Sequence, residues 1–390
     1  MTTLGEARPL DGVVVVSLEQ AIAAPFATRQ LADLGATVIK VERPEGDFAR
    51  HYDSHVEGSS AFFVWANRGK HSVVLDVKQP EQREQFDALI AAADVFVHNV
   101  SPSAARRLGV DAESLQERLP DLIVCDVSGY GEGGPRSGDK AYDLAIQAES
   151  GAFAVTGDDA MSKVGFSVAD ISAGMYALAG ILAALFARER SGVATSVPVV
   201  MLESLTEWLS APLYAAVYGP GRPERTGRRH HAIAPYGTFA LADGRTLLIA
   251  VQSDGEWQRL ARVGLHRDDL ADDPTLATNE QRITHVARLE AEMSEALLSV
   301  PADEALRRLE EASIAVARVN DLDDVWQHEQ LRGRGRFHAV RIPGGTAEML
   351  ASPFGGSTDD AWVPGLDEHD TALVAALLER GRSRLHAVAR

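Results

Sequence analysis

Val13-Val-Val-Val-Ser17 and Thr37-Val-Ile-Lys-Val-Glu42 are short runs rich in β-branched residues, and a helical pattern over Phe26–Leu34 separates them. The alternation continues along the first half of the chain, in apolar runs at Ser72–Asp76, Val95–His98 and Leu122–Val127 and in a helical pattern over residues 80–92. Strands that alternate with helices predict a doubly wound parallel sheet, because a parallel connection needs a crossover. We therefore expect a large Rossmann-like α/β domain, with any ligand at the carboxyl ends of its strands.

The pattern changes in the second half of the chain. Tyr236–Val251 is typical of a β-hairpin that turns at Asp243-Gly244, because this dipeptide suits a tight hairpin turn. Charged helical patterns and a short strand at Ile314–Val319 follow, and a hinge-like segment is expected at Asn320–Asp324. These features predict a smaller α+β domain. The expected division of the chain is 1–220, 221–325 and a C-terminal segment over 326–390.

The composition is that of a globular protein with a strong acidic excess. Hydrophobic residues make up 45% of the chain, charged residues make up 24%, and the formal net charge is -18. Nucleic acid and anionic membranes are polyanions that the average field of this chain repels. We therefore expect neither as a partner, although a local basic pocket for one anionic ligand is compatible with this charge.

Cysteine content and segment lengths bear on the compartment. Cys125 is the single cysteine, which excludes an intrachain disulfide and a cysteine-based zinc cluster and favours a reducing compartment. The start of the chain shows no basic segment that leads into an apolar export signal. The apolar run Ile171–Phe186 is shorter than a membrane span and is predicted to be a core helix, buried on most sides. A cytoplasmic location is the expectation.

Asp170 is a lone carboxylate placed where this apolar helix begins. One interpretation is an N-cap, in which its oxygen accepts a free backbone N–H of the first turn. The other is a nucleophile, which the helix dipole keeps ionised and whose reaction the nearby N–H groups assist by stabilising an oxyanion. The sequence leaves both interpretations open, and they are compatible.

Phosphate-binding motifs are weak in this sequence. The segment Ser17–Pro25 follows the first strand and contains no Gly-x-Gly-x-x-Gly, so the usual dinucleotide cradle is absent. Gly129-Tyr-Gly-Glu-Gly-Gly-Pro135 is rich in glycine but lacks the Gly-Lys-Ser/Thr ending of a P-loop. It is interpreted as a loop.

Together these stretches resemble family III CoA-transferases of the CaiB/BaiF type, the group that contains formyl-CoA transferase. The resemblance covers the chain from about Leu10 to its end, and it rests on the order and spacing of many short pieces rather than on one motif. The pieces are Leu10–Val16, Ala24-Pro25, Leu31–Pro44, Gly46-Asp47, Asn67–Ser72, Leu75–Lys78, Asn99, Arg107–Gly109, Ser128–Gly131, Ala141–Asp143 and Gln147–Gly151.

The resemblance implies an activity. Asp170 would be the aspartate that carries the acyl group, as an anhydride, and then CoA, as a thioester. CoA or acyl-CoA would be a substrate, with no tightly bound cofactor and no metal. The positions that match CoA contacts are Arg43, Leu75, Lys78, Asn99, Arg107, Lys140, Ala141 and Tyr142. The family also implies an interlocked homodimer, in which the last segment of each chain returns to the large domain.

Two departures from the family pattern narrow the expected reaction. Related racemases have a histidine where Tyr142 stands here, and a tyrosine is a poor acid or base for moving an α-proton. Formyl-CoA transferases have a run of glycines where this chain has Arg228-Arg-His-His-Ala-Ile-Ala-Pro-Tyr-Gly237. That loop is similar to members that use C4 to C5 dicarboxylates such as succinate, mesaconate or itaconate. The residues expected to bind the acid are Arg228, His230, His231 and Tyr236.

The departures favour a CoA-transferase that uses a dicarboxylate. A racemase of 2-methylacyl-CoA and a noncatalytic CoA-binding protein of the same fold are the alternatives.

Overall fold

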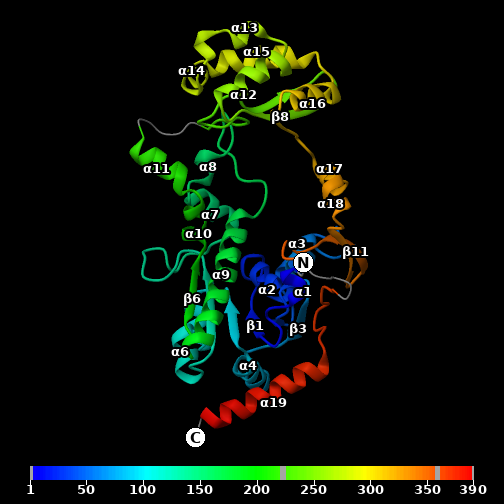
Figure 1. Cartoon of the computed structure of the whole chain (residues 1–390). Coiled ribbons are helices and arrows are strands. Elements are labelled where there is room, and N and C mark those ends of the chain that lie inside the picture. Colours follow the sequence, from blue (N-terminus) through cyan, green and yellow to red (C-terminus); the bar gives the residue numbers. More distant parts are fainter. Residues whose placement is uncertain (1–2, 220–224, 356–360, 389–390) are drawn as a thin grey trace. The chain divides into compact units, whose positions relative to one another are not determined.

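The computed structural model describes residues 3–219, 225–355 and 361–388 (Figure 1). The chain forms two compact units. The first comprises Met1–Ala152, Val164–Ala211 and Leu331–Arg390, and the second comprises Phe153–Lys163 and Pro212–Gln330. The domain boundaries expected at 220 and 325 stay predictions, and residue 220 lies outside the described residues.

The first unit is built on a six-stranded sheet with the order β3-β2-β1-β4-β5-β6. All five neighbouring pairs are parallel, so the predicted doubly wound α/β fold is confirmed. The strands are β1 (Val14–Leu18), β2 (Thr37–Glu42), β3 (Lys70–Val74), β4 (Val95–His98), β5 (Ile123–Ser128) and β6 (Ser196–Val200). The sixth strand was not expected from the sequence, since its run of five residues contains a serine and a proline.

Helices cover both faces of this sheet. Alternate residues of one strand enter two different cores: Val15 packs with residues of α2 and α9, and Val16 packs with residues of α4 and α19. The C-terminal helix α19 therefore belongs to the first unit, where it lies along α4 (Figure 1). The helices of this unit and its borders are α1 (Leu4–Ala7), α2 (Ala23–Asp33), α3 (Ala61–Asn67), α4 (Pro80–Ala92), α5 (Pro102–Leu108), α6 (Ala112–Arg118), α7 (Asp143–Glu149), α8 (Ala152–Val155), α9 (Val168–Ser191), α10 (Met201–Trp208), α11 (Ser210–Tyr218) and α19 (Thr371–Val388).

Helix α9 is less enclosed than the sequence predicted. One face packs on α2 and the sheet, through residues such as Ala173 and Ala177. Its other face is exposed and carries Met175, Tyr176 and Phe186. By length and composition α9 could cross a membrane, but half of its most apolar window is buried within the protein. The prediction that this helix is buried on most sides was therefore wrong for the chain by itself.

The second unit contains the expected hairpin, extended to a three-stranded antiparallel sheet of order β7-β8-β9. Its core joins Phe239 and Ile249 of the sheet to Trp257, Leu289 and Leu309 of the helices. The elements are β7 (Tyr236–Ala240), β8 (Thr246–Ala250), β9 (Ala315–Arg318), α12 (Asp254–Arg259), α13 (Asp268–Ala271), α14 (Asn279–Thr284), α15 (Val286–Leu298), α16 (Ala302–Glu311), α17 (Leu322–Trp326) and α18 (Glu329–Gly333).

The expected hinge at 320–324 contains the start of a helix. Asp321 and Asp324 form a capping box, in which each side chain accepts the other's backbone N–H, and α17 begins at Leu322. This cap was not recognised because aspartate replaces the usual glutamate or glutamine of the motif. A hairpin of β10 (Phe337–Ile342) and β11 (Gly345–Leu350) follows in the first unit.

Candidate active site

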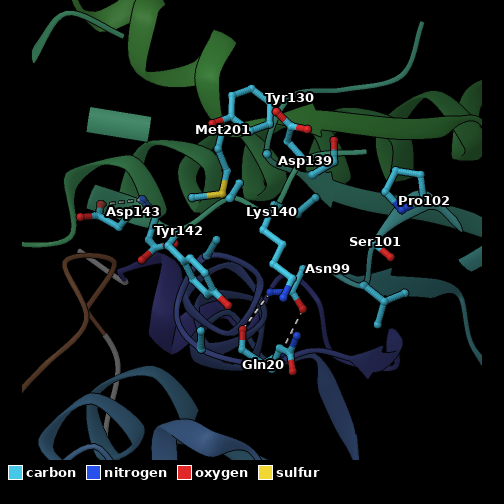
Figure 2. Close-up of a pocket in the computed structure, with 18 of the residues that line it drawn as sticks. Gln20, Asn99, Ser101, Pro102, Tyr130, Asp139, Lys140, Tyr142, Asp143 and Met201 are labelled. Carbon is cyan, nitrogen blue, oxygen red and sulfur yellow. Dashed lines mark hydrogen bonds between the residues drawn. The ribbon is translucent and has the colours of Figure 1, made fainter. Parts of the chain in front are cut away.

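A cavity of about 890 Å³ opens at the carboxyl ends of β1, β4 and β5. Its wall comes from the residues that follow each of these strands: Gln20–Ala23 after β1, Asn99–Ser103 after β4 and Ser128–Tyr130 after β5. Asp170 at the start of α9 completes it, and all the lining residues belong to the first unit. Figure 2 shows Gln20, Asn99 and Tyr130 in this wall. The glycine-rich segment interpreted as a loop therefore lines the cavity.

The Asp170 carboxylate faces this cavity without a partner. Within the described ranges no hydrogen bond or ion pair engages its oxygens. Burial, and to a lesser extent the negative charge of Asp143, raises the pKa of Asp170 to about 7. Loss of solvation thus opposes the ionised form that the helix dipole was expected to favour. Such a carboxylate is partly ionised near neutral pH, and it is less solvated by water than an exposed one.

Asp170 does not cap its own helix; Asp143 does so. Oδ1 of Asp143 accepts the backbone N–H groups of Ala169 at 2.8 Å and of Asp170 at 3.4 Å. Its Oδ2 accepts the side-chain amide of Gln147 at 2.8 Å, and Oε1 of Gln147 accepts the N–H of Val164 at 2.9 Å. The N-cap interpretation of Asp170 was therefore wrong, and its side chain is left available for chemistry.

The segment after β1 lies against the start of α9. A Cβ placed on Gly174 would lie 2.8 Å from the carbonyl oxygen of Ala23, so only glycine allows this approach of α9 to α2. Asp170 stands four residues before Gly174, on the same face of α9. Asp170 and Gln20–Ala23 line the same cavity.

Four of the eight positions predicted to contact CoA line this cavity: Asn99, Lys140, Ala141 and Tyr142. Both polar groups of the Asn99 amide hold the main chain of Gln20, with Oδ1 accepting its N–H at 3.0 Å and Nδ2 donating to its carbonyl at 2.8 Å. Lys140 extends beside them (Figure 2), and no acceptor engages its ammonium group in the described part of the chain. It is therefore a cation available for a phosphate group.

The other four positions lie outside the lining of the cavity. Arg43 is exposed, donates to the carbonyl of Gly46 at 2.9 Å and lies over the ring of Phe48, which does line the cavity. Leu75 is 5% exposed, so its side chain belongs to the core. Lys78 and Arg107 are exposed. Contacts of these four with CoA stay predictions.

The residues expected to bind the acid belong to the second unit. His230 stacks on His231 and on Tyr236, with ring centroids 4.7 and 5.2 Å apart, and Arg228 is exposed nearby in sequence. The lining of the cavity around Asp170 includes none of the four. Among the described residues no group of three or more His, Cys, Asp or Glu side chains is arranged to hold a metal ion.

Sequence reasoning missed an aromatic wall of the same cavity. Tyr52 packs against Phe48 and Phe62, with ring centroids 5.7 and 5.6 Å away. Burial, with the charges of Asp47 and Asp170, raises the pKa of the Tyr52 hydroxyl to about 12, so this group stays protonated. The sequence offered one signal for this wall. Phe48 directly follows Gly46-Asp47, a pair that belongs to the family resemblance, and Tyr52 comes four residues after Phe48.

Comparison with known proteins identifies the family. The model of CoA-transferase family III matches residues 10–369, and the chain belongs to this family. Its structure is also similar to that of a CaiB/BaiF family protein from Brucella suis, with a TM-score of 0.83 and 33% identity over 95% of this chain and 99% of that one.

Three relatives have named activities. The chain is 34% identical to succinate–glutarate CoA-transferase of Agrobacterium fabrum, over 84% of each chain. It is 32% identical to acetyl-CoA:oxalate CoA-transferase of Acetobacter aceti, covering 94% of this chain and 95% of that protein. It is 33% identical to succinyl-CoA:mesaconate CoA-transferase of Haloarcula marismortui, covering 97% and 99%. The protein is accordingly a CoA-transferase, and acyl-CoA and a carboxylic acid are substrates that fit its family.

Proposed function

We propose that this enzyme moves CoA between an acyl-CoA thioester and a dicarboxylic acid through covalent intermediates on Asp170. The observation that carries the proposal is the unpaired Asp170 carboxylate, which faces a cavity at the strand ends. A carboxylate that is partly desolvated and free of hydrogen bonds is a stronger nucleophile than one in water.

The proposed reaction has four displacements at acyl carbons. Ionised Asp170 attacks the thioester carbonyl, and the C–S bond breaks to give a mixed anhydride and CoA thiolate. The thiolate attacks the aspartyl carbonyl and releases the first acid, which leaves an aspartyl-CoA thioester. The acceptor carboxylate attacks this thioester and frees the thiolate again, and the thiolate then takes the new acyl group and restores Asp170.

Each displacement passes through an oxyanion that needs hydrogen-bond donors. Ile22 and Ala23 line the cavity at the first turn of α2, and their backbone N–H groups have no acceptor within the described residues. The dipole of α2 adds positive potential at the same place. We assign these two groups as oxyanion donors, because Asp170 lines the same cavity and stands on the helix that packs on α2.

The relatives support a dicarboxylate as the acid, since two of the three are named for succinate with glutarate or mesaconate. The relative named for oxalate keeps a C2 dicarboxylate among the acids to be tested. The second carboxylate of a C4 to C5 acid would suit a cationic side chain. Arg228, His230 and His231, with the hydroxyl of Tyr236, are proposed for this role, and Lys140 is proposed to bind a CoA phosphate.

A homodimer is part of the proposal. The nine residues of α11 are mostly apolar and none is buried, with Leu213, Tyr214, Val217 and Tyr218 exposed. The exposed face of α9 adds further apolar surface, and exposed apolar patches mark protein interfaces. A cytoplasmic location is proposed from the buried, unpaired thiol of Cys125.

Trapping with hydroxylamine tests the proposal. Incubation with succinyl-CoA and hydroxylamine should convert the Asp170 side chain to a hydroxamate, which peptide mass spectrometry locates. Asp170→Asn should show neither this modification nor CoA transfer, while it still binds CoA. Transfer by a folded Asp170→Asn would refute the mechanism. Deuterium uptake at the α-carbon of a 2-methylacyl-CoA would instead indicate a racemase.

A further inference from the structure

Four buried ionisable side chains, one of them from Glu19 of the segment itself, gather at the segment that connects β1 to α2. Lys40 and Lys70 are 0% exposed, Asp47 is 4% exposed and Glu19 is 5% exposed. Lys40 Nζ lies 2.8 Å from Asp47 Oδ2, and Lys70 Nζ lies 2.7 Å from Glu19 Oε1. Lys40 also lies 3.7 Å from Glu19, so the four side chains form one connected cluster. We call these residues the buried charge cluster.

The cluster holds main-chain groups of the connecting segment. Lys40 Nζ donates to the carbonyl oxygen of Glu19 at 3.3 Å, and Asp47 Oδ1 accepts the N–H of Ala21 at 3.1 Å. Between these two points Asn99 holds Gln20 from the cavity side. Three consecutive residues of this segment are therefore fixed by side chains rather than by secondary structure.

Ala21 needs such support. Its φ is 61°, in the left-handed region that only glycine and a few short polar residues adopt readily. The residue lines the cavity, and Ile22 and Ala23, with the two N–H groups assigned to the oxyanion, follow it directly. A relaxed φ at Ala21 would move both groups relative to Asp170.

Burying ions costs desolvation free energy, so a buried ion pair often stabilises a fold no more than apolar residues of similar volume do. The advantage of a buried ion pair is its fixed geometry. We propose that Lys40 and Asp47 are positioning residues for CoA transfer, which hold Ala21 in its left-handed conformation so that the first turn of α2 faces Asp170. This role rests on the proposed function of the cavity.

The test removes one charge of each sign, so that no buried ion is left unpaired. Lys40→Met/Asp47→Ala is expected to lower kcat about tenfold or more, because small displacements at a reacting centre have large effects. The KM for acyl-CoA is expected to change by less than about threefold, since the groups proposed to bind CoA are unaltered. Adding Ala21→Gly should recover several-fold of the lost kcat, because glycine adopts this φ without support.

A control is the buried Arg68, which lies 2.9 Å from Asp33 in the same unit and is absent from the cavity wall; without Arg68, Asp33 still pairs with Arg29 at 3.4 Å, so no buried ion is left unpaired. Arg68→Met should lower the melting temperature and leave kcat within about twofold of wild type, as expected for a site remote from the chemistry. A folded Lys40→Met/Asp47→Ala with wild-type kcat would overturn the inference. So would a loss of kcat that Ala21→Gly does not relieve.

Two further measurements keep the outcomes distinct. If the double variant does not fold, Asp47→Ala, which removes the acceptor of the Ala21 N–H, takes its place with and without Ala21→Gly and is judged by the same two criteria. Asp170→Asn is assayed beside it. Transfer by Asp170→Asn would refute the proposed nucleophile, whereas wild-type kcat confined to the Asp47 variants would refute the positioning role alone.

Discussion

Oδ1 of Asp143 accepts the backbone N–H of Ala169 at 2.8 Å, and this bond ties the start of α7 to the start of α9. The Asp143 carboxylate therefore caps α9, and the Asp170 carboxylate in the first turn of α9 faces the cavity. The same charge contributes to the raised pKa of Asp170, although burial is the larger cause. Asp143 thus affects both the placement and the protonation of the proposed nucleophile.

Asp143→Asn is predicted to extend activity to lower pH. Asp170 must be ionised to attack, so kcat/KM should rise with pH through the pKa of about 7. Removing the negative charge of Asp143 lowers this pKa and moves the acid limb of the pH profile downward, by less than about one pH unit because burial remains. The pH dependence of kcat/KM measures the shift. An acid limb that moves upward, or stays in place, would contradict the electrostatic role.

The same variant should be slightly less stable. An asparagine side chain can keep the bond to Ala169, but its amide would oppose the amide of Gln147, which now donates to Oδ2 at 2.8 Å. The free energy of unfolding should fall by about 1 kcal/mol, the usual contribution of one hydrogen bond. Urea unfolding checks this value and shows that the pH profile belongs to a folded enzyme.

A comparison of Lys140 with Lys78 tests whether CoA binds in this cavity. Lys140 lines the cavity, whereas Lys78 does not. Lys140→Met is therefore expected to raise the KM for acyl-CoA about fivefold, as loss of one exposed ionic contact implies, with little change in kcat. Lys78→Met should leave KM nearly unchanged. The reverse result in steady-state kinetics would show that CoA does not bind in this cavity as proposed.

The fold could be predicted because its signals are local. The strands at Thr37–Glu42 and Val95–His98 were found at their observed bounds, since each is a β-branched or apolar run between helical patterns. Strand β6 was missed because its burial is incomplete at an edge of the sheet and its composition shows no alternation. The start of α17 was missed because its cap uses an uncommon residue.

Parts of the candidate site could be predicted where an unusual residue or the family resemblance marked them. Asp170 was found because a carboxylate is unusual in an apolar helix. The wall made by Tyr52 and Phe62 was not found, because aromatic residues are ordinary core residues until the fold brings them to a cavity. The buried charge cluster was missed for a similar reason, since Glu19 and Lys70 are separated by 51 residues in sequence.

Gly174 is predicted to set the distance between α9 and α2. A Cβ at this position would lie 2.8 Å from the carbonyl oxygen of Ala23 and 2.9 Å from the ring of Phe26, so Gly174→Ala must push the helices apart. We expect a loss of about 1–3 kcal/mol in the free energy of unfolding and a lower kcat, as overpacking displaces Asp170.

Gly333→Ala is the matched control for Gly174, because nothing lies within 4 Å of the added Cβ in α18. It should keep both stability and kcat. If Gly174→Ala had the stability and kcat of this control, the close approach of α9 to α2 would have no part in positioning Asp170.

Finally, Asp170 is predicted to make the protein less stable as pH rises. Its pKa is about 7 in the folded chain and about 3.9 when unfolded, so the folded state binds more protons between these values and unfolding becomes easier as pH increases. From about pH 5 to about pH 8 the unfolding free energy of wild type should fall, relative to Asp170→Asn, by on the order of 2 kcal/mol. Urea unfolding at both pH values measures the difference, with Glu84→Gln, at an exposed position of α4, as a control that should follow wild type. Parallel curves for wild type and Asp170→Asn would mean that Asp170 is as well solvated in the folded chain as in the unfolded one, and would contradict a pKa raised by burial.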